Sequence, residues 1–500
     1  MSTAGFHLRA LTACSLLLCG DLGLASETGR SPFRNDRYLL LDTRVVKSAE
    51  NATLKIGTVQ KSAANPLFGE EKPWEPFFDN VYPNVIYDRQ QQLYKCWYSP
   101  FSIALSATGM SLKERQTKDF DKHWPRPHED AFCYATSKDG IHWLKPNLGI
   151  VEFGGTKNTN LLWRNGPHGT GVFKDLRDPD PTRRYKAVFR TSGPREGFSC
   201  RFSADGITWG ETIVCLPTMR ADTHNNAIWA PTLGKYVAMT REMERGYGRV
   251  VVRTESDDFV SWSPGKTIMR RHRAHHEPYS MPIFYHAGVY LGLVTIFQQS
   301  GTDFSWPELA WSPDTTAWHR INIETPLIPR SDKVLDYDYG CIYCSAPIIR
   351  KDKILIYYCG SDWKHTSWRN GHLCLATLRA DGFAGFEQIA TDRTAVITTN
   401  PLTYNGNPIR VSADVDRGGS LKVTVLGENG ETKIAAKPIT TTVTDARLAL
   451  DKPFEGERIQ LKFELNHAKI YSFNFEECTE ANRSTRAPGS DQTPRSDREN

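Results

Sequence analysis

The sequence lacks the features of a membrane-spanning or predominantly helical protein. Beyond residue 25 it has no run of about 20 apolar residues, which is the length that a spanning helix requires. Apolar residues rarely recur at the 3.6-residue period of an amphipathic helix. We therefore expect little helix and no integral membrane segment in the mature chain.

An excess of charge of one sign is missing as well. The 62 Lys and Arg residues against 57 Asp and Glu residues leave a net charge of only +5, and no basic run is interleaved with aromatic residues. These features argue against a nucleic-acid partner. Cys341-x-x-Cys344 has no second CxxC pair, so the sequence predicts no zinc site.

The N-terminus has the features of a secretory signal. His7 and Arg9 precede an apolar run at residues 11–18, and the small residues at 23–25 suit a cleavage site. We expect residues 1–25 to be removed and the protein to be periplasmic or extracellular. Cys19 follows a partial lipoprotein signature, in which Leu18 is bulkier than the motif prefers.

A seven-residue turn recurs along the chain. Its first copy is Ser137-Lys138-Asp139-Gly140-Ile141-His142-Trp143, and the Asp positions of all copies are 139, 205, 258, 314 and 381. Asp and Gly suit a tight turn in which the carboxylate accepts hydrogen bonds from backbone N–H groups. A repeat of this length is typical of a propeller or a similar array, so we interpret these Asp residues as structural.

Around each turn the sequence predicts four short strands. Five such repeats predict an all-β fold, a five-bladed β-propeller over residues 38–395. Alternation at period two, with Gly-rich turns, then predicts a small antiparallel β-sandwich over residues 400–476. Residues 477–500 have few apolar side chains, which predicts a disordered tail. Several cysteines fall on neighbouring predicted strands, where disulfides and buried thiols are equally compatible with the pattern.

The central funnel of a propeller is the default place for a site. Acidic residues stand beside the first strand of several repeats, and we predict Asp79 and Asp175 as base or nucleophile and electrostatic partner, with Glu277 as general acid. Two carboxyl groups, one ionised and one protonated, are what hydrolysis of a glycosidic bond requires. The sequence therefore predicts a hydrolase that acts on a poly- or oligosaccharide.

Other polar residues near the same strands are predicted to bind substrate. They are Lys174, Asp222, His224, Arg241, His276 and Asp338. His275-His276 has no third ligand at a suitable spacing, so we predict no metal ligands. We expect no cofactor, although the channel has room for a structural cation, and we expect a monomer whose partner is a carbohydrate.

The repeated turn resembles the Asp-box of sialidases and other β-propellers, although here the Gly directly follows the Asp. The arrangement of a propeller and a sandwich resembles the furanosidase-type clan of glycoside hydrolase families 32 and 43. Arg177-Asp178-Pro179 matches the short Arg-Asp-Pro motif of the invertase group. Phe78-Asp79-Asn80 lacks that group's Asn-Asp-Pro-Asn-Gly context, and no Glu-Cys pair occurs where its acid would lie.

Two other functions are compatible with the same fold. A non-catalytic carbohydrate-binding propeller would place aromatic and amide groups in the funnel without a pair of acids. A scaffold at the cell surface would instead expose an apolar patch and use the sandwich for docking.

Overall fold

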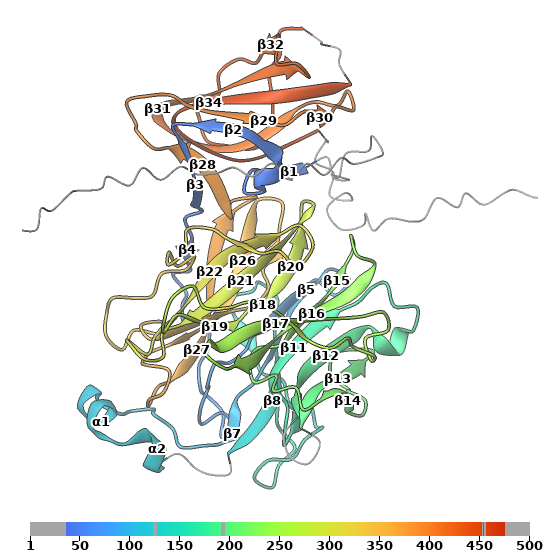
Figure 1. Cartoon of the computed structure of the whole chain (residues 1–500). Coiled ribbons are helices and arrows are strands. Elements are labelled where there is room, and N and C mark those ends of the chain that lie inside the picture. Colours follow the sequence, from blue (N-terminus) through green and yellow to red (C-terminus); the bar gives the residue numbers. More distant parts are fainter. Residues whose placement is uncertain (1–36, 124–127, 192–195, 453, 455–456, 476–500) are drawn as a thin grey trace, which may run out of the picture. The chain divides into compact units, whose positions relative to one another are not determined.

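The computed structural model describes residues 37–123, 128–191, 196–452, 454 and 457–475. The predicted signal peptide and the predicted tail lie outside these residues. The described residues are nearly all in strands and loops (Figure 1), which confirms the all-β fold class. In the part of the chain that the structure describes, no helix is both long and apolar enough to cross a membrane. Each of the eight cysteines described there is a free thiol.

The described part of the propeller forms four sheets, and a single parallel pairing between Ser305 and Cys341 joins two groups of antiparallel strands in the last of them. We number the groups of strands as blades in chain order. Blade one contains β5 (Asn84–Asp88), β6 (Leu93–Tyr98), β8 (Glu129–Ser137), β9 (Trp143–Leu144) and β10 (Leu161–Arg164). Blade two contains β11 (His168–Lys174), β12 (Tyr185–Thr191), β13 (Gly197–Ser203) and β14 (Ile213–Pro217), with the 3-10 helix η2 (Pro181–Arg183) between β11 and β12. Blade three contains β15 (Asn226–Ala230), β16 (Lys235–Glu244), β17 (Gly248–Ser256) and β18 (Lys266–Met269).

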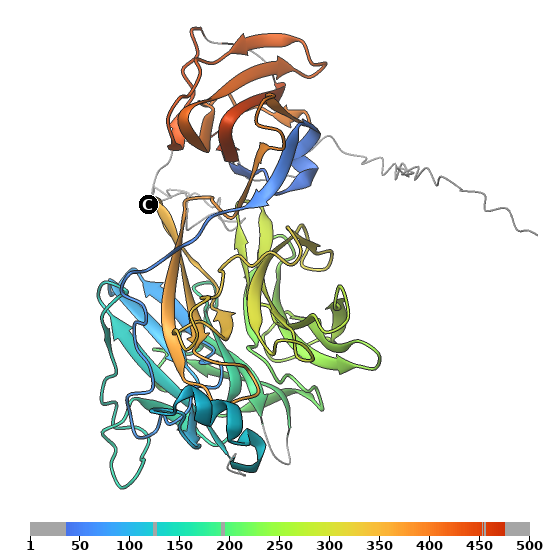
Figure 2. The same ribbon diagram turned by 90° about the vertical axis from the view of Figure 1, so that its left-hand side faces the viewer.

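The last two blades complete the ring. Blade four contains β19 (Glu277–Ser280), β20 (Ile283–His286), β21 (Val289–Phe297), β22 (Ser305–Ser312) and β23 (His319–Arg320). Blade five contains β24 (Cys341–Cys344), β25 (Ile348–Ile349), β26 (Lys353–Ser361), β27 (Gly371–Arg379) and, from the start of the chain, β4 (Gln60–Lys61). Because β4 pairs with β27, the N-terminal segment supplies the outer strand of the last blade. Blade five lies beside blade one, where the Val85 N–H donates to Ser345 Oγ (Figure 2).

An insertion follows the second strand of blade one. It contains β7 (Phe101–Ile103), α1 (Leu112–Thr117) and α2 (Phe120–His123). Arg115 of α1 pairs with Asp362 at 2.6 Å and also donates to Asn370. The insertion is thereby fastened to the loop between β26 and β27 of blade five.

The second sheet system takes strands from both ends of the chain (Figure 1). Its N-terminal members are β1 (Arg37–Leu39), β2 (Val46–Glu50) and β3 (Ala52–Ile56), with the 3-10 helix η1 (Thr43–Val45) between β1 and β2. Its C-terminal members are β28 (Ala384–Gln388), β29 (Ala395–Thr399), β30 (Leu402–Thr403), β31 (Arg410–Gly427), β32 (Thr432–Ala435), β33 (Val443–Arg447) and β34 (Arg458–Asn474). The predicted boundaries at 38 and 395 therefore do not follow the sheets, because β1–β3 pair with β34, β29 and β28.

The repeated Ser-x-Asp turns join the third and fourth strands of the blades. In the first copy, Asp139 accepts hydrogen bonds from the N–H groups of Ile141 and His142, and Ser137 Oγ accepts one from Gly140. The copies at Asp205, Asp258 and Asp314 repeat this pattern. The degenerate copy differs: Asp381 is buried and contacts Arg37, His286 and Ser472.

The innermost strands β5, β11, β15, β19–β20 and β24–β25 run in the same direction around the central channel. We call the end at which they begin the leading end and the other the trailing end. Two buried polar residues, Asn84 and His224, lie between the leading end and the trailing end. Asn84 Oδ1 accepts hydrogen bonds from the N–H of Val172 at 2.9 Å and from His224 Nε2 at 3.2 Å. Burial lowers the pKa of His224 to about 3, so its imidazole is neutral at pH 7.

Candidate functional site at the leading end

Charged and aromatic side chains converge where the innermost strands begin. We call this set the leading-end cluster. It contains the carboxylates Asp79, Asp130, Asp222 and Glu277, the cationic groups His168, Arg190, Arg241, Arg249 and Arg369, and the rings of Tyr82, Tyr279, Tyr343 and His365. Most of these residues lie in loops or at strand ends, where side chains are not committed to packing between sheets.

Asp79 lies in the loop before β5 and is held from two sides. Arg369, whose side chain is only 1% exposed, approaches Asp79 Oδ1 at 2.5 Å. Asn80 Nδ2 donates to Asp79 Oδ2 at 3.0 Å and to the Tyr82 hydroxyl at 2.7 Å. Val81 and Tyr82 both have positive φ, 56° and 44°. A β-branched residue in this conformation is strained, and such strain is concentrated at functional sites.

His168 bridges two carboxylates from different blades. Its Nδ1 lies 2.9 Å from Asp130 Oδ1, and its Nε2 lies 3.2 Å from Asp222 Oδ1. Burial alone would lower the pKa of His168, but the two carboxylates raise it well above its ordinary value of 6.5. At neutral pH the ring is therefore an imidazolium that donates from both nitrogens.

A close approach between loops brings blades two and three together here. A side chain at Gly169 would place its Cβ 1.6 Å from the Thr223 carbonyl oxygen, and Gly169 has a φ of 61°. Only glycine satisfies both conditions. The resulting contact, in which the Asn225 N–H donates to the Gly169 carbonyl, sets the loop of Asp222 beside His168.

Asp222 is the most heavily paired carboxylate of the cluster. Besides His168, Arg241 approaches it at 2.5 Å and Arg190 at 3.5 Å. Burial alone would raise the pKa of Asp222, but the hydrogen bond from His168 and the charge of Arg241 hold it well below its usual range. Asp222 is therefore ionised across the physiological range.

Glu277 begins β19 and lies on the blade-four side of the cluster. Arg249 Nη1 lies 2.7 Å from Glu277 Oε2. The same guanidinium lies over the Tyr279 ring at 5.5 Å, and the guanidinium of Arg241 lies over that ring at 4.5 Å. Tyr279 thus joins the surroundings of Glu277 to those of Asp222 through cation–π contacts.

Three tyrosines and a histidine form the buried base of the cluster. The Tyr279 ring centroid lies 5.3 Å from that of Tyr343 and 5.2 Å from that of His365. The Tyr343 hydroxyl lies 2.9 Å from His365 Nδ1. Burial, together with Arg369, Arg249 and Arg241, lowers the pKa of His365 well below 6.5, so this ring is neutral.

A small hollow lies among the acidic groups. It has a volume of about 10 Å³ and is lined by Asp79, Tyr82, Ser99, Pro100, Phe101, Asp130 and His168. This volume corresponds to about one water molecule, and the polar groups around it could serve as the partners that a bound water needs. The hollow therefore offers a water site that touches two carboxylates and an imidazolium.

Glu70 supports the loops of this region. Its carboxylate accepts hydrogen bonds from the Phe78 N–H at 2.7 Å and the Gly371 N–H at 3.1 Å, and from Asn370 Nδ2. It thereby connects the loop of Asp79 with the loop of Arg369. Burial raises the pKa of Glu70 to about 7. Because both oxygens face protein donors, Glu70 is a positioning residue.

Asp175 and Lys174 lie at the opposite end of β11 from His168. Asp175 is 1% exposed, contacts Lys186 Nζ at 3.0 Å and accepts a hydrogen bond from the Tyr236 hydroxyl at 2.6 Å. Lys174 pairs with Asp88 at 2.9 Å. The structure therefore does not bring either residue together with Asp79, and the prediction that Asp175 is the electrostatic partner of Asp79 needs correction.

Three predicted substrate-binding residues also contact other neighbours. Asp338 is fully buried and pairs with Lys61 at 2.6 Å. His276 lies in the loop before β19 and contacts Gln298 and Glu324, whereas Glu277 contacts Arg249 of the cluster. His224 lies beneath the cluster, with its ring centroid 5.3 Å from that of Tyr82. Asp79, Asp222, Arg241 and Glu277 do lie in the cluster.

Sequence reasoning missed Asp130, His168, Arg190, Arg249 and Arg369. The sequence pattern predicts the first strand of this blade over residues 171–177, whereas β11 begins at His168, so the pattern pointed to the opposite end of the strand. Arg190 lies near the end of β12, as Arg241 lies near the end of β16, and this correspondence between blades was visible in the sequence. Asp130, Arg249 and Arg369 belong to no motif.

Among the described residues, no group of three or more His, Cys, Asp or Glu side chains is arranged to hold a metal ion. No family model matches the sequence, and no curated protein matches it. Similar solved structures include an N-acetylgalactosamine deacetylase from F. plautii in complex with blood group B trisaccharide. It is 12% identical, with 67% of this chain and 97% of that chain covered and a TM-score of 0.46.

Two glycoside hydrolases are among the other similar structures. One is a family 43 arabinoxylan arabinofuranohydrolase from Bacillus subtilis, 10% identical, with 83% of this chain and 98% of that chain covered and a TM-score of 0.41. The other is the GH32 β-fructofuranosidase of Bombyx mori, 10% identical, with 83% of this chain and 94% of that chain covered and a TM-score of 0.39.

Proposed function

We propose that the leading-end cluster binds an oligo- or polysaccharide and hydrolyses a glycosidic bond. The observation that carries this proposal is the meeting of Asp79, Asp222 and Glu277, from three blades, around the rings of Tyr82 and Tyr279. Carboxylates and guanidinium groups suit the hydroxyl groups of a sugar, and the buried rings support them from below.

In the proposed reaction Asp79 is the general base. A water in the adjacent hollow loses a proton to Asp79 as its oxygen attacks the anomeric carbon. Glu277 acts as general acid and gives a proton to the departing glycosidic oxygen as the bond to the leaving sugar breaks, and the proton that Asp79 takes from the water balances it. Asp222, held ionised by Arg241 and His168, supplies the negative charge that stabilises an oxocarbenium-like transition state.

Export belongs to the same proposal. A polysaccharide substrate would be met outside the cytoplasm, which agrees with the signal features predicted for residues 1–25. The rival function, a non-catalytic carbohydrate-binding propeller, predicts aromatic and amide groups without opposed acids. Asp79, Asp222 and Glu277 are such acids, and they favour the hydrolase.

The test is a hydrolysis screen of plant and algal polysaccharides, with reducing ends as the readout. The wild-type protein should release reducing ends from at least one of them, and the double variant Asp79→Asn/Glu277→Gln should release none above background. Asp257→Asn is the matched control, because Asp257 is 81% exposed on a blade turn. Equal hydrolysis by the wild type and the double variant would disprove the assignment. Binding of a polysaccharide without any hydrolysis would favour the rival function.

A further inference from the structure

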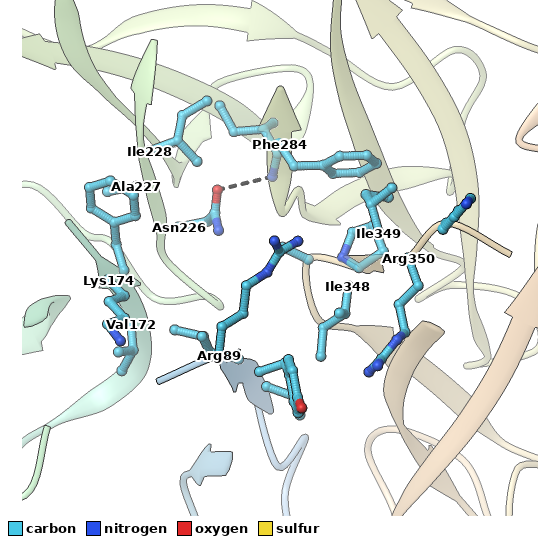
Figure 3. Close-up of a pocket in the computed structure, with 18 of the residues that line it drawn as sticks. Arg89, Val172, Lys174, Asn226, Ala227, Ile228, Phe284, Ile348, Ile349 and Arg350 are labelled. Carbon is cyan, nitrogen blue, oxygen red and sulfur yellow. Dashed lines mark hydrogen bonds between the residues drawn. The ribbon is translucent and has the colours of Figure 1, made fainter. Parts of the chain in front are cut away.

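A larger cavity occupies the trailing end of the central channel (Figure 3). Its volume is about 660 Å³, within the range of small-molecule sites. Every blade contributes to its wall, through β5, β11, β15, β20 and β25. It is therefore a feature of the ring as a whole.

The wall of this cavity is mostly apolar and partly open to solvent. Its side chains include Ile86, Val172, Ile228, Phe284, Ile348 and Ile349. All except Phe284 are only partly buried, although they belong to the innermost strands of the fold. Covering such surface removes apolar area from water, which favours binding.

The polar groups of the cavity are mainly cationic. Arg89, Lys174, Arg350 and Lys351 line it, and Asp352 is the one acidic residue in the lining. Arg89 is exposed and points into the cavity in Figure 3. Within the described residues, no carboxylate lies within 4.0 Å of the basic groups of Arg89 or Lys351.

Two of the cations are held in place by neighbours. Lys174 Nζ is fixed by Asp88 at 2.9 Å, and Arg350 donates to the Tyr94 hydroxyl at 2.6 Å while lying over the Tyr87 ring. Such fixed groups lower the entropy cost of binding an anion. Asn226 adds a polar group to the wall, since its Oδ1 accepts from the Ile283 N–H and the amide faces the cavity (Figure 3).

We propose that the trailing-end cavity is a second binding site, for a small amphipathic anion that joins an apolar ring system to a carboxylate, sulfate, sulfonate or phosphate group. The ring system would contact Val172, Ile228 and Ile348, and the anionic group would meet Arg89. Asn84 and His224 lie between this cavity and the leading-end cluster, so the site is independent of the proposed hydrolysis.

The test uses two fluorescent probes of similar size. One is 1-anilinonaphthalene-8-sulfonate, an aromatic anion, and the other is N-phenyl-1-naphthylamine, which has the same rings without the sulfonate. The wild-type protein should bind the anionic probe with one-to-one stoichiometry. Arg89→Glu should weaken that binding at least tenfold and change binding of the neutral probe less than twofold.

Two further variants separate charge from shape. Arg89→Lys keeps the charge and should retain the affinity for the anionic probe within about threefold. Ile348→Trp should project a bulkier side chain into the space of the ring system and weaken binding of both probes at least tenfold, with an unchanged urea-unfolding midpoint as evidence of folding. Failure of the wild type to bind the anionic probe, or unchanged binding in Arg89→Glu or in Ile348→Trp, would overturn the proposal.

Discussion

The two ends of the same channel differ in how their charges are neutralised. At the leading end, cations meet carboxylates: Arg369 pairs with Asp79, Arg249 with Glu277, and His168 with both Asp130 and Asp222. At the trailing end, cations outnumber acids in the cavity lining, and the wall between them is apolar. One end therefore pairs opposite charges, whereas the other places an excess of cations beside an apolar wall, and the two proposals rest on this contrast.

The difference arises from which part of each innermost strand meets the channel. At the leading end the channel is lined by loops with strained residues such as Val81 and Tyr82. At the trailing end it is lined by the strands themselves, and partly exposed apolar side chains such as Ile86, Val172 and Ile228 form the wall. The loops therefore carry the charged side chains of the leading end, and the strands carry the apolar side chains of the trailing end.

The largest expected effect is on kcat, and it differs between Asp79 at the leading end and Asp175 at the trailing end. Asp79→Asn should lower kcat of the proposed hydrolysis by about 10² to 10⁴, the usual contribution of a general base. Asp175→Asn should leave kcat within about twofold, because Asp175 contacts Lys186 and Tyr236 far along β11.

Asp175→Asn should instead lower the free energy of unfolding. Removing one partner of a buried ion pair costs about 2–3 kcal/mol here, less than the usual value because Lys186 keeps Asp178 at 2.8 Å. Urea unfolding measures this change in the free energy of unfolding, and steady-state kinetics measures the kcat of both variants. A large loss of kcat in Asp175→Asn with normal rates in Asp79→Asn would reverse the roles assigned to the two residues.

A smaller effect concerns how the leading end is braced. Burial raises the pKa of Glu70 from 4.5 to about 7, so the folded state binds a proton that the unfolded state releases. The stability that this proton confers is complete below about pH 4.5 and is lost as the pH rises through about 7. The loss is up to about 3 kcal/mol, at about 1.4 kcal/mol for each pKa unit.

In Glu70→Gln this part of the pH dependence should be absent. Urea unfolding between pH 4.5 and 7.5 measures it, and Glu71→Gln is the matched control, since Glu71 is the adjacent acid and is 54% exposed. A pH dependence in Glu70→Gln equal to that of the wild type would show that Glu70 does not titrate as the geometry requires.

The sequence predicted the all-β fold well because the strand and turn patterns are local. Asp139 and its counterparts at 205, 258 and 314 bond their own turns, and such signals are contained within seven residues. The boundaries of the propeller could not be predicted in the same way. Pairing of β1 with β34 joins Arg37 to Asn474, and no local pattern reports a contact between residues so far apart in the chain.

The candidate site was predicted in part for a related reason. Asp79, Asp222 and Glu277 precede or begin innermost strands, so the rule that such positions face the funnel was sufficient. β11 begins three residues earlier than the sequence pattern predicts. Asp175 therefore lies at the trailing end of this strand, and the residue at its leading end is His168. Asp338 and His276 stand at similar positions but face other partners, and sequence position alone does not report that direction.

The most direct test is a crystal structure of the Asp79→Asn variant with the oligosaccharide that the wild type cleaves. We predict the sugar at the leading end, in contact with Tyr82, Tyr279 and Asp222, with the scissile bond beside residue 79 and Glu277. A sugar bound only in the trailing-end cavity, against Arg89 and Ile348, would contradict the assignment of the leading-end cluster as the active site.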